Sequence, residues 1–128
     1  MSIFGIGTDI VQIARIQKIV SRYGVAFAKR ILSKEEYLQY QQLSSNQCAP
    51  YLAKRFAGKE AVAKALGIGI ANGIAFKDIS ITNTVLGQPI VSYLGEALQY
   101  VIKHNLAKTY ISLADERDFA VAFVTITI

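Results

Sequence analysis

The feature that most constrains this chain is its C-terminal segment, which is apolar on both sides of an extended strand. Two sets of apolar side chains alternate there, namely Phe119, Val121 and Phe123 with Ala120, Ala122 and Val124. Successive side chains of a strand point to opposite faces of a sheet. We therefore expect residues 119–128 to be buried on both faces, by a helix or by another subunit.

The composition indicates one domain, spanning residues 1–128. Of these residues 52% are hydrophobic and 18% are charged, which is typical of a chain with a packed core. Cys48 and His104 are the single residues of their types, which excludes a disulfide framework and a cysteine- or histidine-rich metal site. Asp9 and Arg15 interrupt the start of the chain, so we expect no signal peptide. No apolar run is long enough to span a bilayer, so we expect a cytoplasmic protein with no membrane partner.

The net charge of +5 favours anionic partners. Nucleic acid, an anionic membrane surface, an acidic protein and a phosphate-rich small molecule all fit this charge. The chain has no polybasic run, no Arg/Gly-rich tail and no zinc-finger spacing. We therefore expect no nucleic-acid partner.

The order of apolar periods and turn residues predicts an α+β fold, with helices packed on a mostly antiparallel sheet. A strand over 3–7 precedes Asp9, and a helix then runs to Gly24. A capping box at Ser33 opens a second helix toward Leu43. The rest of the prediction is a loop over 44–50, a helix over 51–66 with an apolar stripe, a hairpin over 79–84 and 89–93, a helix over 96–105, and a hairpin over 110–113 and 119–128.

Asp9 is the first candidate functional residue. It directly follows an apolar strand and precedes an apolar helix. A carboxylate at that depth needs a hydrogen bond, an ion pair or a metal. It would serve either as the N-cap of the following helix or as a functional carboxylate.

The helix over 51–66 carries the second candidate group. Glu60 and Lys64 are spaced i,i+4 there, as are Arg55 and Lys59. These residues form either an ordinary solvated helix face or one metal-binding carboxylate among cations that hold phosphate. Gly67 follows as a helix C-cap or as a point where a ligand approaches the backbone.

The first helix has a basic face. Arg15, Lys18 and Arg22 lie together on it. They form either a solvated surface or a docking surface for an acidic partner protein.

Together these motifs resemble the holo-[acyl-carrier-protein] synthase family, the short bacterial type of 4'-phosphopantetheinyl transferase. The resemblance covers nearly the whole chain. It rests on GIGTDIV at 5–11, RILS at 30–33 with Glu36, RFA at 55–57 with KEA at 59–61 and KA at 64–65, the segment 67–73, GQP at 87–89, and ISL at 111–113 before Asp115.

The resemblance implies a function and an assembly. Such enzymes move the phosphopantetheine arm of coenzyme A onto a serine of acyl carrier protein, in support of fatty acid biosynthesis, and release adenosine 3',5'-bisphosphate. The family fold is α+β, and the short members are trimers with active sites between subunits.

The resemblance also assigns site residues. It makes Asp9 and Glu60 the magnesium ligands and places Lys64 beside the leaving phosphate. Arg55, Lys59, Gly67 and Asp115 are expected to bind coenzyme A, and Arg15, Lys18 and Arg22 to dock acyl carrier protein. Many relatives carry His where this chain has Asp115, so the role of Asp115 stays open between a protonated donor, the metal shell and a water ligand. The base that deprotonates the serine stays open between Glu60 and a metal-held water.

Overall fold

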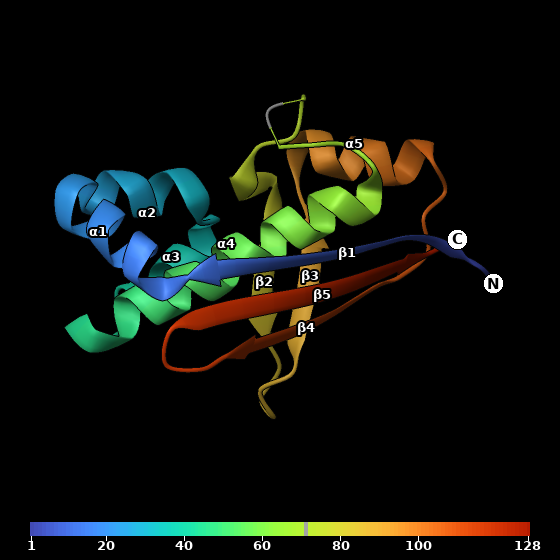
Figure 1. The fold of residues 1–128 in the computed structure, drawn as a ribbon. Helices are drawn as coiled ribbons and strands as arrows, with labels where there is room; N and C mark the ends of the chain where they lie inside the picture. Colours follow the sequence, from blue (N-terminus) through green and yellow to red (C-terminus); the bar gives the residue numbers. More distant parts are fainter. Residues whose placement is uncertain (71) are drawn as a thin grey trace.

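The structure, a computed structural model, describes residues 1–70 and 72–128. In the described part, five α-helices, one 3₁₀ helix and two antiparallel sheets follow one another along the chain (Figure 1). The elements are β1 (Ile3–Gln12), α1 (Ile13–Tyr23), α2 (Val25–Ile31), α3 (Lys34–Tyr40), α4 (Ser45–Leu66), the 3₁₀ helix Phe76–Asp78, β2 (Ile79–Asn83), β3 (Pro89–Tyr93), α5 (Gly95–Lys103), β4 (Thr109–Asp115) and β5 (Phe119–Thr127). The α+β class and the antiparallel sheets are confirmed.

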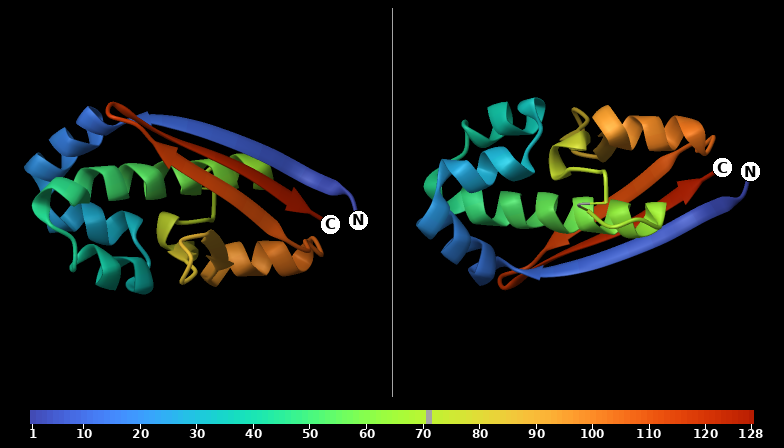
Figure 2. Two further views of the ribbon diagram at one scale, coloured as in Figure 1. Left: turned by 90° about the horizontal axis from the view of Figure 1, so that it is seen from below. Right: turned by 90° about the horizontal axis from the view of Figure 1, so that it is seen from above.

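The long helix α4 is the centre of the fold. It lies along one face of a three-stranded sheet of order β1-β5-β4 (Figure 2). The hairpin β2–β3 forms a separate two-stranded sheet that also contacts α4. The apolar core lies where α4 meets the sheet, and it includes Leu52, Val62, Val124 and Ile126.

Two glycines let α4 lie directly on β1. A Cβ atom added to Gly5 or to Gly7 would stand 1.9 Å from the carbonyl oxygen of Ala65 or Ala61 of α4. No larger residue fits that distance, so glycine is required for this close helix–strand approach. This close packing fixes the position of β1 relative to the turn of α4 that carries Glu60.

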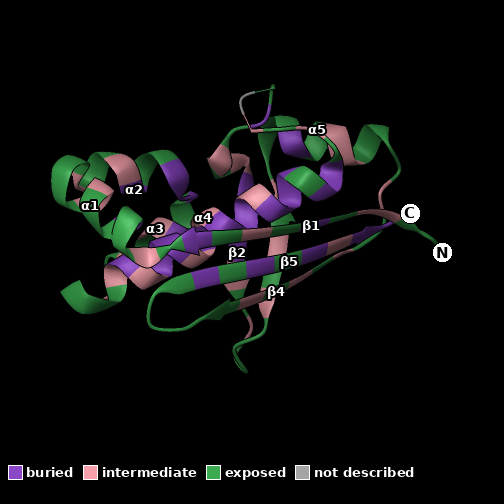
Figure 3. Ribbon diagram, viewed as in Figure 1, coloured by how far each residue is buried: buried purple, intermediate pink, exposed green. Residues whose placement is uncertain are grey.

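The helix α4 is buried on nearly all sides (Figure 3). The expected apolar stripe is therefore wrong, because the sheet covers one side of the helix and α1, α2 and β2 cover others. The expected loop over 44–50 is also wrong. Ser44 and Gln47 form a capping box that starts the helix, and Pro50 lies inside it.

The first strand runs further than expected. It continues through Asp9 to Gln12, so Ile10 is in a strand and not in a helix. Pairing with β5 explains the extension, because Ile10 lies opposite Val121 and Gln12 opposite Phe119. The strand partner is 111 residues away in sequence, so a local pattern does not reveal it.

The remaining elements follow the sequence patterns with one addition. Ser33 caps α3 in a complete capping box with Glu36. Both hairpins form, with Ile79 opposite Tyr93 and Asp115 opposite Ala120. The sequence did not predict α2, a short helix that begins directly after Gly24.

The last strand is buried on one face only. Ala120, Ala122, Val124 and Ile126 are buried beneath α4, whereas Val121 and Phe123 are 40% and 51% exposed. Within this single chain α4 covers one face of β5 and the other face is open, so cover of that face by another subunit stays a prediction. Among the described residues, no helix has the length and apolar character needed to cross a bilayer.

Candidate active site

Asp9, Glu60 and Lys64 meet where β1 passes under α4. The Lys64 Nζ atom donates to the Thr8 carbonyl oxygen at 2.9 Å and to Asp9 Oδ1 at 3.3 Å. Asp9 lies on the face of β1 that α4 covers, and its side chain is 19% exposed. The helix N-cap is Gln12, so the capping explanation for Asp9 is wrong. The structure leaves Asp9 as a partly buried carboxylate beside a flexible cation.

Glu60 is a second carboxylate in the same place. Burial, and after it the negative charge of Asp9, raises the pKa of the Glu60 carboxyl above its ordinary value. Lys64 and Arg15 act in the opposite direction. Among the described residues, no hydrogen bond to the Glu60 carboxylate is formed. Two carboxylates in a partly buried site repel each other, and an added cation would relieve that repulsion.

Arg15 connects this carboxylate pair with the basic face of α1. Its guanidinium lies 5.8 Å from the centre of the Phe56 ring on α4, one turn before Glu60. Lys18 and Arg22 are exposed on the same helix, and Arg22 lies over the Tyr23 ring at 5.3 Å. Of these three cations, Arg15 is the one that acts on the Glu60 carboxylate.

Lys59 is not placed to bind a phosphate. Its side chain is completely buried, and its ammonium donates to Glu36 Oε1 at 2.6 Å and to the carbonyl oxygens of Ile31 at 2.7 Å and Phe76 at 3.0 Å. All three N–H groups are thus in use. The expectation that Lys59 contacts coenzyme A is corrected by this geometry, which makes Lys59 a structural anchor of α4.

Glu36 is the partner that sequence reasoning missed. Its carboxylate accepts from Lys59, from the Ser33 backbone N–H at 2.8 Å and from the Ile81 N–H at 2.9 Å. The capping box signalled the Ser33 contact, but nothing local in the sequence signalled the other two. This buried network joins α3, α4 and β2, and it holds the helix turn next to Glu60.

Arg55 is also buried, under the hairpin β2–β3. It donates to the Ile81 carbonyl oxygen and to Asn83 Oδ1, each at 3.2 Å, and it stacks over the Tyr51 ring. Its Nε atom is buried and has no hydrogen-bond partner among the described residues. A buried donor of this kind is satisfied when an acceptor oxygen reaches it.

Asp115 and Gly67 lie apart from the carboxylate pair. Asp115 is at the end of β4, two strand spacings or about 10 Å across the sheet from β1. It forms an ion pair with Lys54 at 3.1 Å, a contact that none of its three expected roles included. Gly67 ends α4 in the left-handed conformation, with φ of 82°, which confirms the expected C-cap. The segment 67–73 of the resemblance includes residue 71, which lies outside the described residues.

The site offers a metal two carboxylates. In the described part of the chain, no group of three or more His, Cys, Asp or Glu side chains converges. Magnesium commonly takes one or two protein carboxylates and completes its shell with phosphate oxygens and waters. Asp9 and Glu60 fit that donor set.

Comparisons with known proteins show the family and the fold of this chain. The family model of the 4'-phosphopantetheinyl transferase superfamily matches residues 5–124. The holo-[acyl-carrier-protein] synthase of Aliivibrio fischeri is 48% identical over 124 residues, which are 97% of each chain. The crystal structure of the synthase from Neisseria meningitidis matches with a TM-score of 0.91 and 40% identity, over 98% of this chain and 99% of that one. The Helicobacter pylori synthase in complex with coenzyme A matches with a TM-score of 0.82 and 32% identity, over 95% and 99%. The chain belongs to the 4'-phosphopantetheinyl transferase superfamily.

Proposed function

We propose that this chain is a magnesium-dependent holo-[acyl-carrier-protein] synthase. It transfers 4'-phosphopantetheine from coenzyme A to a serine of apo acyl carrier protein, releases adenosine 3',5'-bisphosphate and supports fatty acid biosynthesis. The observation that carries this proposal is the meeting of Asp9, Glu60 and Lys64, which come from segments more than 50 residues apart. The names of the relatives and the coenzyme A complex of the Helicobacter pylori protein support the choice of substrates.

Asp9 and Glu60 are the residues that would hold magnesium. The raised pKa of Glu60 beside Asp9 supports this assignment, because a pair of mutually repelling carboxylates favours a divalent cation. The ion supplies charge neutralisation at the phosphate oxygens when it is bound. Reactions at phosphorus of this kind depend mainly on positioning and electrostatic stabilisation.

Lys64 and Glu60 act on the reacting groups themselves. The Lys64 side chain is 56% exposed, so its ammonium can turn from Asp9 to the leaving phosphate and stabilise the charge that develops there. Glu60 is a candidate general base for the carrier serine, because a raised pKa lies closer to that of an effective base at neutral pH. Arg55, Gly67 and Asp115 remain the proposed coenzyme A contacts, and the unpartnered Arg55 Nε supports the first of them.

The basic face of α1 is the proposed docking surface for acyl carrier protein. Arg15, Lys18 and Arg22 are exposed on it, and Arg15 adjoins the carboxylate pair. A partner seated there would bring its serine beside Glu60. An acidic partner complements this charge.

We also propose a homotrimer with active sites between subunits. The exposed apolar face of the sheet supports it, because Ile6, Ile10, Tyr110, Val121 and Phe123 are each at least 40% exposed on neighbouring strands. An apolar patch of this kind is typical of a subunit interface.

The deciding experiment is mass spectrometry of apo acyl carrier protein incubated with coenzyme A, magnesium and this protein. The proposal requires the carrier to gain the mass of one phosphopantetheine. Omitting magnesium or adding a chelator should abolish the gain. A carrier of unchanged mass, with coenzyme A bound to the protein, would instead indicate a non-catalytic binding module.

A further inference from the structure

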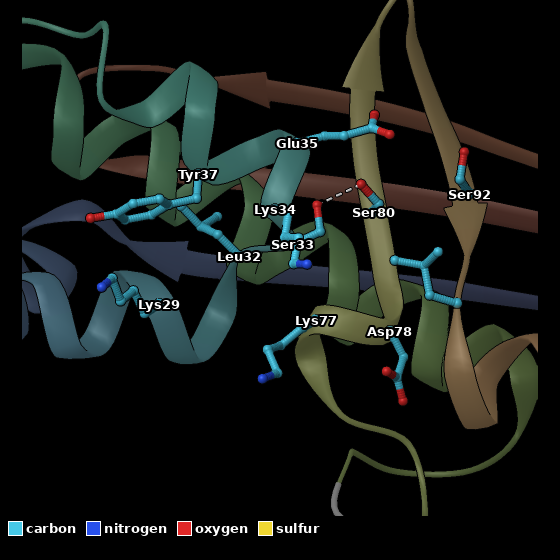
Figure 4. Close-up of a pocket in the computed structure, with 11 residues that line it drawn as sticks. Lys29, Leu32, Ser33, Lys34, Glu35, Tyr37, Lys77, Asp78, Ser80 and Ser92 are labelled. Carbon is cyan, nitrogen blue, oxygen red and sulfur yellow. Dashed lines mark hydrogen bonds between the residues drawn. The ribbon is translucent and has the colours of Figure 1, made fainter.

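A hollow lies outside the proposed active site. It has a volume of about 640 Å³ and opens between α2, α3 and the hairpin β2–β3 (Figure 4). Of the described residues that line it, none belongs to α4 or to the three-stranded sheet, so Asp9, Glu60 and Lys64 are not part of it. This size is within the usual range for small-molecule sites, and it exceeds what a bare inorganic ion needs.

The lining combines apolar walls with charged groups. Leu32, Tyr37 and Leu94 supply apolar surface. Three cations and two anions also line the hollow, namely Lys29, Lys34 and Lys77 with Glu35 and Asp78. The net charge of the lining is therefore +1. Among the described residues, none of the three lysines is in an ion pair. One excess positive charge complements a monoanion better than a dianion.

A pair of buried serines supplies a hydrogen-bond donor to this hollow. Ser33 and Ser80 are 4% and 3% exposed, and their hydroxyl oxygens lie 2.7 Å apart (Figure 4). Ser33 Oγ also accepts from the Glu36 backbone N–H. The bond between the serines uses one hydroxyl hydrogen, and among the described residues no acceptor takes the other. A buried donor without an acceptor costs free energy, which an oxygen of a ligand would recover.

We propose that this hollow binds an amphiphilic carboxylate, a monoanion on a short aliphatic chain. The carboxylate accepts from the serine pair and faces the lysines, and the chain packs on Leu32, Tyr37 and Leu94. The apolar walls exclude a free inorganic anion as the best occupant, and the charge balance excludes an uncharged lipid. The site is independent of the transferase chemistry proposed above, since no residue is shared.

Octanoate is the probe that tests this proposal, followed by backbone amide chemical shifts in the whole protein. Octanoate should shift the amides of Ser33, Ser80 and Ser92 in a saturable way. Octanol has a similar chain without the charge, and acetate has the charge without the chain, so both should bind at least about tenfold more weakly. Equal binding of octanol would overturn the role of the charge. Shifts confined to the sheet face of Val121 and Phe123, or no saturable shift, would overturn the site.

Substitutions of the lining residues test which of them contact octanoate. Ser80→Ala removes one of the two hydroxyls and should weaken octanoate about tenfold or more, the size of one hydrogen bond to a charged group. Lys29→Ala and Lys77→Ala change exposed residues, so the fold is kept, and each should weaken octanoate and reduce the salt dependence of binding. Lys103→Ala on α5 is the matched control and should leave binding unchanged. Unchanged affinity in all three pocket variants would refute the proposal even if octanoate binds.

Discussion

Two residues of β1 and α4 decide whether the proposed chemistry is possible. Asp9→Asn and Glu60→Gln are each expected to remove most transfer, at a cost of several kcal/mol, about the size of metal-type charge neutralisation. The fold should be kept or slightly stabilised, because each change removes the repulsion that raises the Glu60 pKa. Steady-state transfer assays and thermal unfolding of each variant measure the two effects.

The magnesium dependence of coenzyme A binding is the specific readout for this pair. It should disappear in both variants, whereas a general loss of fold would also lower the unfolding temperature. Asn caps helices about as well as Asp, but Asp9 is in the middle of a strand. A fully active Asp9→Asn protein would remove half of the proposed metal site.

The buried Lys59–Glu36 pair makes a different prediction, on stability. Lys59→Met leaves Glu36 charged and buried without its cation and should cost about 3–5 kcal/mol in the free energy of unfolding. The double variant Lys59→Met/Glu36→Gln should recover part of that loss, because the uncompensated charge is gone. Urea unfolding of both single variants and the double variant gives the coupling. If the loss of unfolding free energy in the double variant equals the sum of the two single losses, the two groups do not interact.

Among the elements, α4 depends on the glycines beneath it. Gly7→Ala places a methyl group against the Ala61 carbonyl oxygen, so strand and helix must separate, at a cost of about 3 kcal/mol or more. Gly58→Ala is the matched control on α4. Its new Cβ meets only the ends of the Ile81, Leu113 and Ile111 side chains, which can move, and alanine favours the helix. Comparable unfolding free energies for the two variants would contradict the close-approach argument.

The helix α1 carries the docking prediction. Arg22→Glu should weaken use of acyl carrier protein by about 1 kcal/mol or somewhat more, with coenzyme A binding nearly intact. Arg15→Glu should have a larger effect, because Arg15 also opposes the raised Glu60 pKa. Titration of each substrate at two salt concentrations measures this, with Lys103→Glu on α5 as control. An equal loss of coenzyme A affinity in the Arg22→Glu variant would argue against a docking face.

For the whole molecule, the exposed apolar face of the sheet predicts self-association. Sedimentation equilibrium at micromolar concentration should give a trimer, and Phe123→Asp should give a monomer, because a charge in an apolar interface is costly. Ser112→Asp is the control on the same sheet face. It replaces a residue that is already polar, so it should weaken the trimer less than Phe123→Asp does. A monomeric wild-type protein would contradict both the trimer and active sites shared between subunits.

The sequence by itself determined the elements whose signals are local. The capping box at Ser33, the C-cap at Gly67 and the two hairpins each depend on residues within a few positions, and each is confirmed. The motif resemblance led to the family for the same reason, since it depends on residue identities and not on contacts. Glu60 and Lys64 were singled out by their spacing in one helix.

Tertiary structure alone decided the properties that depend on partners far along the chain. Pairing with β5 extends β1 past Asp9, which excludes the helix cap as one of its two expected roles and leaves Asp9 as a strand carboxylate near Glu60. Packing on all sides of α4 buried Lys59 against Glu36, although its sequence context is that of a solvated helix face. Periodicity reports which residues share a face, but the environment of that face is set by long-range packing. A buried lysine and an exposed one therefore look alike until the fold brings their partners to them.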